Sequence, residues 1–233
     1  MRKKRRGTAK QAEEISLNII NVAAEMFASN GYKAVSLRKV SDKVGISHGL
    51  IRHHIGSKES LWHRVSHHLY DDYQSSIVKI LKALPKGIPP SLMLYLFTMR
   101  LFTSMMHSQV STRLLYESVQ QKDNIASNFL EDNREINNLI DSFNQSADEK
   151  LINTAELKWH LLMLTYGSVC INPHLSPLDD LRGSTAQKLR LIHWEMVNKQ
   201  MVNIFNIDKE HTITLVELDE FTHELSTFTT EGL

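Results

Sequence analysis

Apolar residues recur at helical spacing along most of the chain, which predicts a protein built from α-helices. A first stripe ends at Asn30–Gly31, where glycine can terminate a helix. Further stripes predict helices over residues 61–84 and 92–106, and the five prolines fall within 85–90 and 173–177, where they mark connections. No strand pattern is convincing, so the sequence predicts an all-α fold of about nine or ten helices. The first stripe consists of Ile15, Ile19, Val22, Ala23, Met26 and Phe27.

Three residue pairs match the capping box that begins many helices. In this motif a Ser or Thr hydroxyl and a side chain three residues later satisfy backbone donors at the helix start. Each pair stands before an apolar run, which predicts helices over residues 148–171 and 185–205 and another after residue 214. The pairs are Ser146 with Glu149, Ser184 with Gln187, and Thr214 with Glu217.

The two helices expected at 148–171 and 185–205 carry apolar residues around more than one face. One packed face cannot cover all of these residues, so a second buried face is needed. A self-complementary interface between two copies of the chain would supply it, with Trp159, Leu162, Leu189 and Met196 as candidate contacts. The alternative is that both helices lie at the centre of a large monomeric bundle.

Residues 36–61 have the pattern of a helix-turn-helix. Leu37, Val40 and Val44 give a short amphipathic helix, and Gly45 supplies a turn in which a positive φ costs glycine least. Ser47 can cap a second short helix. Its expected inner face is made of Leu50, Ile51 and Ile55. Two short helices joined by a glycine turn are typical of a DNA-binding motif whose second helix enters the major groove, although a chance helical hairpin is the alternative.

Many residues of this segment stand at the spacings of one known family. They are Ser36, Leu37, Arg38, Val40, Gly45, Ile46, Ser47, Gly49, Ile51, His54, Gly56, Ser57, Lys58, Glu59 and Leu61, preceded by a helix that ends in Phe27–Tyr32. In these positions the chain resembles the N-terminal domain of TetR-family transcriptional regulators over about residues 13–61. It departs from the family pattern at Arg52, where tyrosine is frequent, at Ile55 in place of an aromatic residue, and at Ser41 in place of alanine.

The resemblance implies a domain organisation and a function. It implies a three-helix DNA-binding domain over residues 13–64, preceded by a basic flexible arm at 1–12 and followed by a helical ligand-binding and dimerisation domain at 65–233. It also implies a homodimeric repressor in which each subunit meets one half-site of a double-stranded DNA operator and a small-molecule ligand releases it.

The chemistry of the side chains suggests how this segment would meet DNA. Polar or small residues on the second helix, namely Ser47, His48, Gly49 and His53, are candidates for approaching bases. Donors suited to phosphates are Arg38, Arg52, His54 and Lys58, with Ser36 also assigned to the DNA-binding set. The arm from Arg2 to Arg6, with Lys10, would follow the DNA backbone or enter a minor groove, or else form a solvated tail.

The distribution of charge agrees with this division. The whole chain has a formal net charge of only +1. Residues 1–64, however, hold 13 of the 27 Lys and Arg residues and 5 of the 26 Asp and Glu residues, a net charge of +8, which leaves −7 for residues 65–233. A basic N-terminal part suits contact with phosphates, and an acidic remainder is expected to avoid DNA.

Other candidate sites are weaker. His63 and His67 have the four-residue spacing of two zinc ligands, but surface histidines are the expected interpretation, and we predict no metal and no cofactor. The single cysteine, Cys170, excludes an intrachain disulfide and is expected to be a buried, inert thiol. The apolar helix 92–106 suits either an ordinary core or a ligand pocket. Candidate pocket residues are Met99, Phe102, Met106 and Tyr116.

No signal peptide and no segment long enough to span a bilayer is found, so we expect a cytoplasmic protein without a membrane partner. No catalytic motif is present, and the sequence therefore favours a ligand-released DNA-binding repressor that is not an enzyme. Two alternatives remain open. One is a DNA-binding protein of the same fold that is regulated by a protein partner, and the other is an all-α enzyme.

Overall fold

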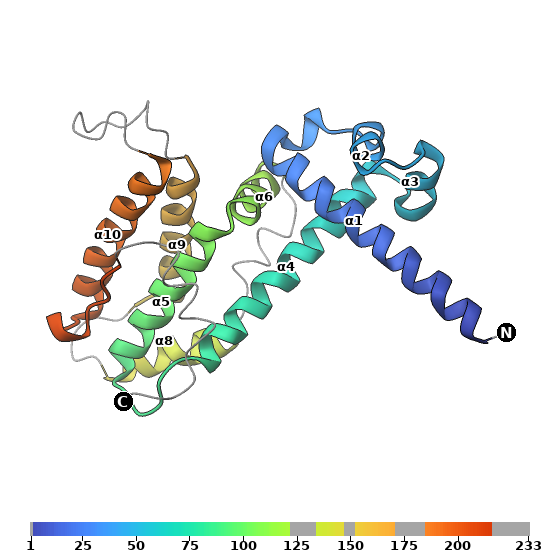
Figure 1. Ribbon diagram of the computed structural model, residues 1–233. Coiled ribbons are helices and arrows are strands. Elements are labelled where there is room, and N and C mark those ends of the chain that lie inside the picture. The colour runs from blue at the N-terminus through green and yellow to red at the C-terminus, as the bar shows by residue number, and fades with distance from the viewer. Residues whose placement is uncertain (1, 122–133, 147–151, 171–184, 216–233) are drawn as a thin grey trace. The chain divides into compact units, whose positions relative to one another are not determined.

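A computed structural model describes residues 2–121, 134–146, 152–170 and 185–215 (Figure 1). Within these ranges the chain forms α-helices and one short 3-10 helix and contains no strand, which confirms the predicted all-α class. The helices are α1 (Arg2–Ala34), α2 (Leu37–Val44), α3 (His48–Ile55), α4 (Lys58–Lys82), α5 (Pro90–His107), α6 (Gln109–Gln120), α8 (Arg134–Ser146), α9 (Thr154–Cys170), α10 (Ala186–Phe205) and the 3-10 helix η3 (Lys209–His211). None of the described helices is long and apolar enough to cross a membrane.

The chain divides into two compact units that are not simple halves of the sequence. The first unit contains residues 1–73 and 113–129, and the second contains residues 74–112 and 130–233. The first unit therefore includes α1 to α3, most of α4 and most of α6. The second unit includes the remainder of α4 together with α5, α8, α9 and α10.

The core of the first unit forms where α1 packs against α2 and α3. Its buried side chains come from every helix of the unit, and Phe27 lies at the centre of an aromatic cluster with Tyr32 and Trp62. The expected stop at Gly31 is confirmed, because this residue has φ 76° and ψ 157°, outside the helical region. Other members of the core are Ile19, Ala23, Val40, Ile51, Ile55, Leu61 and Val65.

In the second unit α5 packs against α8, α9 and α10 (Figure 1). Because neighbours cover it on several sides, α5 buries residues around most of its circumference, including the polar Thr98 and Thr103. The indole Nε1 of Trp194 on α10 donates a hydrogen bond of 2.7 Å to Thr103 Oγ1. The buried hydroxyl of Thr103 is therefore paired across the packed helices, as most buried polar atoms are.

A second buried network ties the chain after α10 to the same core. Tyr95 Oη donates to Asn198 Oδ1 at 2.6 Å and accepts from the backbone N–H of Ile213 at 2.9 Å. The amide Nδ2 of Asn198 in turn donates to the carbonyl oxygen of Ile213 at 2.8 Å. Three segments distant in the sequence are thus joined by three mutually supporting hydrogen bonds.

The predicted helices α9 and α10 are present, but the residues predicted to cap them were less accurate. Ser146 is the last residue of α8, and its hydroxyl donates to the carbonyl of Phe143, so the prediction that it begins a helix is wrong. The next helix starts instead at Thr154, where Asn153 Oδ1 accepts from the N–H groups of residues 155 and 156. The cap of α10 is Thr185 rather than Ser184, which lies outside the described residues.

Several other expectations fall outside the described part of the chain. These are the side chains of the basic arm at residues 2–10, the thiol of Cys170, and Glu217, the partner expected for Thr214. The backbone of α1 is described from Arg2, and that of α9 to Cys170.

Candidate nucleic-acid interface

Local hydrogen bonds fix the geometry of α2, the turn and α3. Ser36 caps α2 by accepting from the Lys39 N–H at 3.3 Å, and Ser47 caps α3 by accepting from the Leu50 N–H at 3.1 Å. Between them Gly45 adopts φ 79°, and its N–H donates to the carbonyl of Ser41 at 2.9 Å. Serine caps and a left-handed glycine are the chemistry that a sharp turn between two short helices needs. The predicted helix-turn-helix is therefore present.

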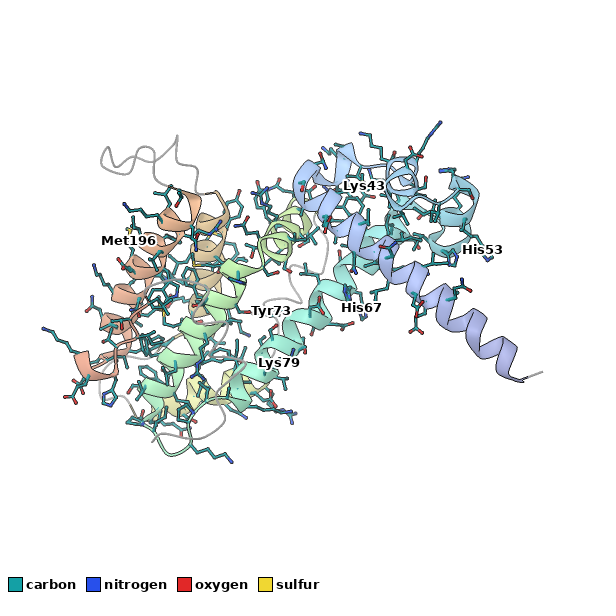
Figure 2. All side chains as sticks on the ribbon, in the orientation of Figure 1. Lys43, His53, His67, Tyr73, Lys79 and Met196 are labelled. Atoms are coloured by element: carbon teal, nitrogen blue, oxygen red, sulfur yellow. The ribbon has the colours of Figure 1, made fainter. Side chains whose placement is uncertain are left out.

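The two sides of α3 differ sharply. Ile51 and Ile55 are buried in the core of the first unit. The predicted base-contacting residues lie on or beside the solvent-facing side of the helix, where Figure 2 shows His53 at the outer surface. The exposed set consists of Ser47, His48, Gly49, Arg52 and His53, while His54 is half-buried, with its ring 5.6 Å from that of His53. A polar, open helix face of this kind can approach base edges and phosphates.

The position of Leu50 on α3 differs from the prediction. It was expected on the inner face of α3, but it is 37% exposed. Ile51 and Ile55, four residues apart, fill the buried stripe, and Leu50 lies about 100° around the helix from Ile51. An exposed leucine among polar neighbours can make apolar contact with a thymine methyl group, so Leu50 is a candidate base-contacting residue that the sequence analysis missed.

The phosphate-binding candidates lie on three helices. Ser36 and Arg38, at the start of α2, and Arg52 on α3 are exposed. Lys58, the first residue of α4, has its Nζ 4.2 Å from the centre of the Tyr32 ring and donates a hydrogen bond of 3.4 Å to the carbonyl of Lys33. Partial burial lowers the pKa of Lys58, while burial and the Glu59 carboxylate raise the pKa of Tyr32. The ammonium of Lys58 therefore contacts both the Tyr32 ring and the carbonyl oxygen of Lys33.

The histidines of α4 interact mainly with acidic residues on the same helix. His67 Nδ1 lies 3.0 Å from Asp71 Oδ2, and His68 Nε2 lies 3.7 Å from Asp72 Oδ2. Together with His63 they line an open groove against α1. No group of three or more His, Cys, Asp or Glu residues able to hold a metal ion occurs in the described part of the chain.

The remaining candidates lie on α5, α6, α9 and α10. Of the four proposed pocket residues, three are fully buried on α5, whereas Tyr116 is exposed on α6 in the first unit. Of the four proposed dimer contacts, two are strongly exposed, one is half-buried, and Leu189 is buried within its own unit. The buried pocket residues are Met99, Phe102 and Met106, the exposed dimer candidates are Trp159 and Met196, and the half-buried one is Leu162.

The sequence of the helix-turn-helix has recognisable relatives. The sequence profile of the family described as "Bacterial regulatory proteins, tetR family" matches residues 19–65. The HTH-type transcriptional repressor Rv3405c of Mycobacterium tuberculosis is 35% identical over 57 residues, which are 24% of this chain and 30% of that protein. The HTH-type transcriptional repressor KstR2 of Rhodococcus jostii is 35% identical over 54 residues, 23% of this chain and 26% of that protein. The chain thus spans less than a third of either curated relative.

Solved structures extend the similarity of fold beyond this segment. A bacterial regulatory protein in the TetR family from Rhodococcus RHA1 has a TM-score of 0.57 at 16% identity, with 82% of this chain and 96% of that chain covered. The ketosteroid transcriptional regulator KstR2 of Mycobacterium tuberculosis has a TM-score of 0.54 at 20% identity, with 78% and 93% covered. At these identities the structures show a shared fold. The matched profile shows that residues 19–65 are similar to the DNA-binding domain of the TetR family, and the solved structures show that the chain shares the fold of such regulators beyond this segment.

Proposed function

We propose that this protein is a DNA-binding transcriptional repressor that a small-molecule ligand releases from its operator. The observation that carries the proposal is the exposed face of α3, on which Ser47, His48, Arg52 and His53 lie opposite the buried Ile51 and Ile55. A helix so anchored can enter a major groove without losing its own packing. Such a protein would act in the cytoplasm, where bacterial DNA lies.

Sequence-specific binding to DNA tests this proposal directly. We expect a duplex selected from a randomised library to bind the full-length protein, with affinity falling steeply from about 50 to about 200 mM salt because phosphate contacts release counterions. Arg52→Ala should weaken binding by about 10- to 100-fold, since arginine reads guanine or holds phosphate with two hydrogen bonds. Fluorescence anisotropy with a labelled duplex measures both effects.

A matched control separates a local contact from net charge. Lys79→Ala removes the same charge from an exposed position on the part of α4 that belongs to the second unit, and it should leave the affinity for DNA unchanged. Equal loss of affinity in the two variants, or binding by the wild type that does not depend on salt, would contradict the proposed role of α3.

A second copy of the chain is the proposed partner of α9 and α10. The two helices pack together, with His193 Nε2 2.9 Å from the carbonyl oxygen of Leu164. Trp159 on α9 is nevertheless 56% exposed and Met196 on α10 is 60% exposed, and Figure 2 shows Met196 on the outer surface of its helix. Exposed large apolar residues on two paired helices suit a self-complementary interface. A dimer interface formed by paired helices is also what the resemblance to the TetR family leads us to expect.

Charge placed at these positions is expected to dissociate the dimer. The double variant Trp159→Glu with Met196→Glu should sediment as a monomer at micromolar concentration, because it would bury four like charges in one two-fold interface. Analytical ultracentrifugation of the wild type and the variant measures this. Val78→Glu, which adds a charge at an exposed apolar position of α4, is the matched control and should remain dimeric. A wild-type monomer would refute the proposed interface.

The proposed ligand site lies around α5. Met99, Phe102 and Met106 provide buried, adaptable apolar surface on this helix. Beside them the hydroxyl of Thr98 is fully buried and has no hydrogen-bond partner among the described residues. Since buried polar atoms are normally paired, this hydroxyl is available to a ligand that combines an apolar body with one hydrogen-bonding group.

A further inference from the structure

The corner at Gly31, within α1, is held by a residue from a distant part of the sequence. Gly31 leaves the helical conformation, and the backbone N–H of the next residue, Tyr32, donates a hydrogen bond of 2.8 Å to Oε1 of Glu117 on α6. The two residues are 85 positions apart in the chain but belong to the same unit. A bond between a carboxylate and a backbone N–H is charge-assisted and stronger than a neutral one.

Glu117 is itself held in position. Its Oε1 also accepts a hydrogen bond of 2.9 Å from Gln121 Nε2, and the side chain is half-buried. Its other carboxylate oxygen, Oε2, would lie 3.6 Å from a Cβ atom at Gly31, so the carboxylate sits directly against the corner. The conformation of Gly31, with φ 76°, disfavours any other residue there.

The corner in turn contacts Lys58, one of the proposed phosphate-binding residues. The Tyr32 ring packs against Phe27 at 5.6 Å and against Trp62 at 5.3 Å between ring centres. The Lys58 ammonium lies 4.2 Å from the centre of the Tyr32 ring and also bonds the carbonyl of Lys33. Both contacts of Lys58 therefore come from residues immediately after Gly31. If the backbone of Tyr32 moves, the two groups that hold this ammonium move with it.

We propose that Glu117 is a positioning residue for DNA binding. It fixes the backbone of Tyr32, so that the ring of Tyr32 and the carbonyl of Lys33 hold the Lys58 ammonium at the start of α4, where it meets a DNA phosphate. Lys58 lies at a helix N-terminus, whose backbone donors add to its attraction for that phosphate. This inference rests on the proposed function, because it concerns how the first unit binds DNA.

The test uses the full-length protein and the selected duplex. Glu117→Ala should weaken DNA binding about five- to tenfold. It should also reduce the slope of log affinity against log salt concentration by nearly as much as Lys58→Ala does. For one lost phosphate contact this reduction is about 0.9. In the Lys58→Ala background, Glu117→Ala should have little further effect, because its partner is already absent. Glu117→Gln keeps an oxygen acceptor for the Tyr32 N–H and should restore most of the affinity.

Controls distinguish positioning from general stability. Gln120→Ala, at an exposed site on the same helix, should bind like the wild type. If circular dichroism shows that the Glu117→Ala variant is unfolded, Tyr32→Leu tests the same positioning role. This variant keeps the backbone hydrogen bond to Glu117 but removes the aromatic ring that contacts Lys58. We expect this variant to show the same loss of salt slope as Lys58→Ala, and an unchanged slope would overturn the inference.

Three further results would reject this inference, for different reasons. An unchanged affinity and salt slope in a folded Glu117→Ala variant would refute the positioning role while leaving the proposed function intact, as would an equal loss with and without Lys58. A wild-type protein that binds no DNA in a salt-dependent way would refute the proposed function itself, and the inference with it.

Discussion

Replacing Trp194 with alanine is expected to lower the free energy of unfolding of the second unit by about 3 to 5 kcal/mol. The indole is 1% exposed, so its removal leaves a large cavity. It also removes the 2.7 Å hydrogen bond to Thr103 Oγ1, a buried atom. Chemical denaturation followed by circular dichroism measures the change.

Two further variants separate the causes of this loss. Trp194→Phe keeps much of the volume but not the donor, so it should cost less than alanine does, about 1 to 3 kcal/mol. Gln200→Ala, at an exposed position of the same helix, should stay within about 0.5 kcal/mol of the wild type. A loss below about 1 kcal/mol for Trp194→Ala would contradict the central place of this side chain in the core.

Replacing Phe27 with alanine should have an effect of similar size in the first unit, again about 3 to 5 kcal/mol. Phe27 is 1% exposed, and its ring lies 5.2 Å from that of Trp62 and 5.6 Å from that of Tyr32. Because Trp62 is part of the cluster, its fluorescence and the circular dichroism of the helices should both report earlier unfolding in denaturant.

DNA affinity should fall together with stability in this variant, because the Tyr32 ring that contacts Lys58 would lose one of its two aromatic packing partners. Leu17→Ala is the matched control, since it shortens an exposed apolar side chain on the same helix. It should change neither stability nor DNA binding by more than the usual effect of a surface substitution, about 0.5 kcal/mol. Equal effects of the two substitutions would argue against a packed aromatic cluster.

The helix-turn-helix could be predicted from the sequence because its determinants are local. Ser36 bonds a backbone group three residues away, Ser47 does the same, and Gly45 closes the turn within four residues. Such short-range chemistry can be recognised in a sequence without knowledge of the remaining fold. The all-α class followed in the same way from helical spacing.

Features that depend on distant partners could not be predicted in this way. The bond from Tyr32 to Glu117 joins residues 85 positions apart, and that from Ile213 to Tyr95 joins residues 118 apart. Leu50 was expected on the inner face of α3 but is 37% exposed, and Leu189, a candidate dimer contact, is buried within its own unit. Apolarity alone does not tell which neighbour covers a residue. Ser146 matched a capping pattern, but the hydroxyl bonds a carbonyl of the preceding helix.

The first unit is assembled from residues 1–73 and 113–129, so recombination between these two segments would divide it. A recombination that exchanged only the leading segment would pair a new Gly31–Tyr32 corner with the old α6 and its Glu117. The exposed face of α3 can diverge to suit a new operator without this restriction, because its side chains face solvent. In a repressor of the kind proposed, operator preference could therefore change by point substitution on α3, whereas the corner depends on a residue 85 positions away.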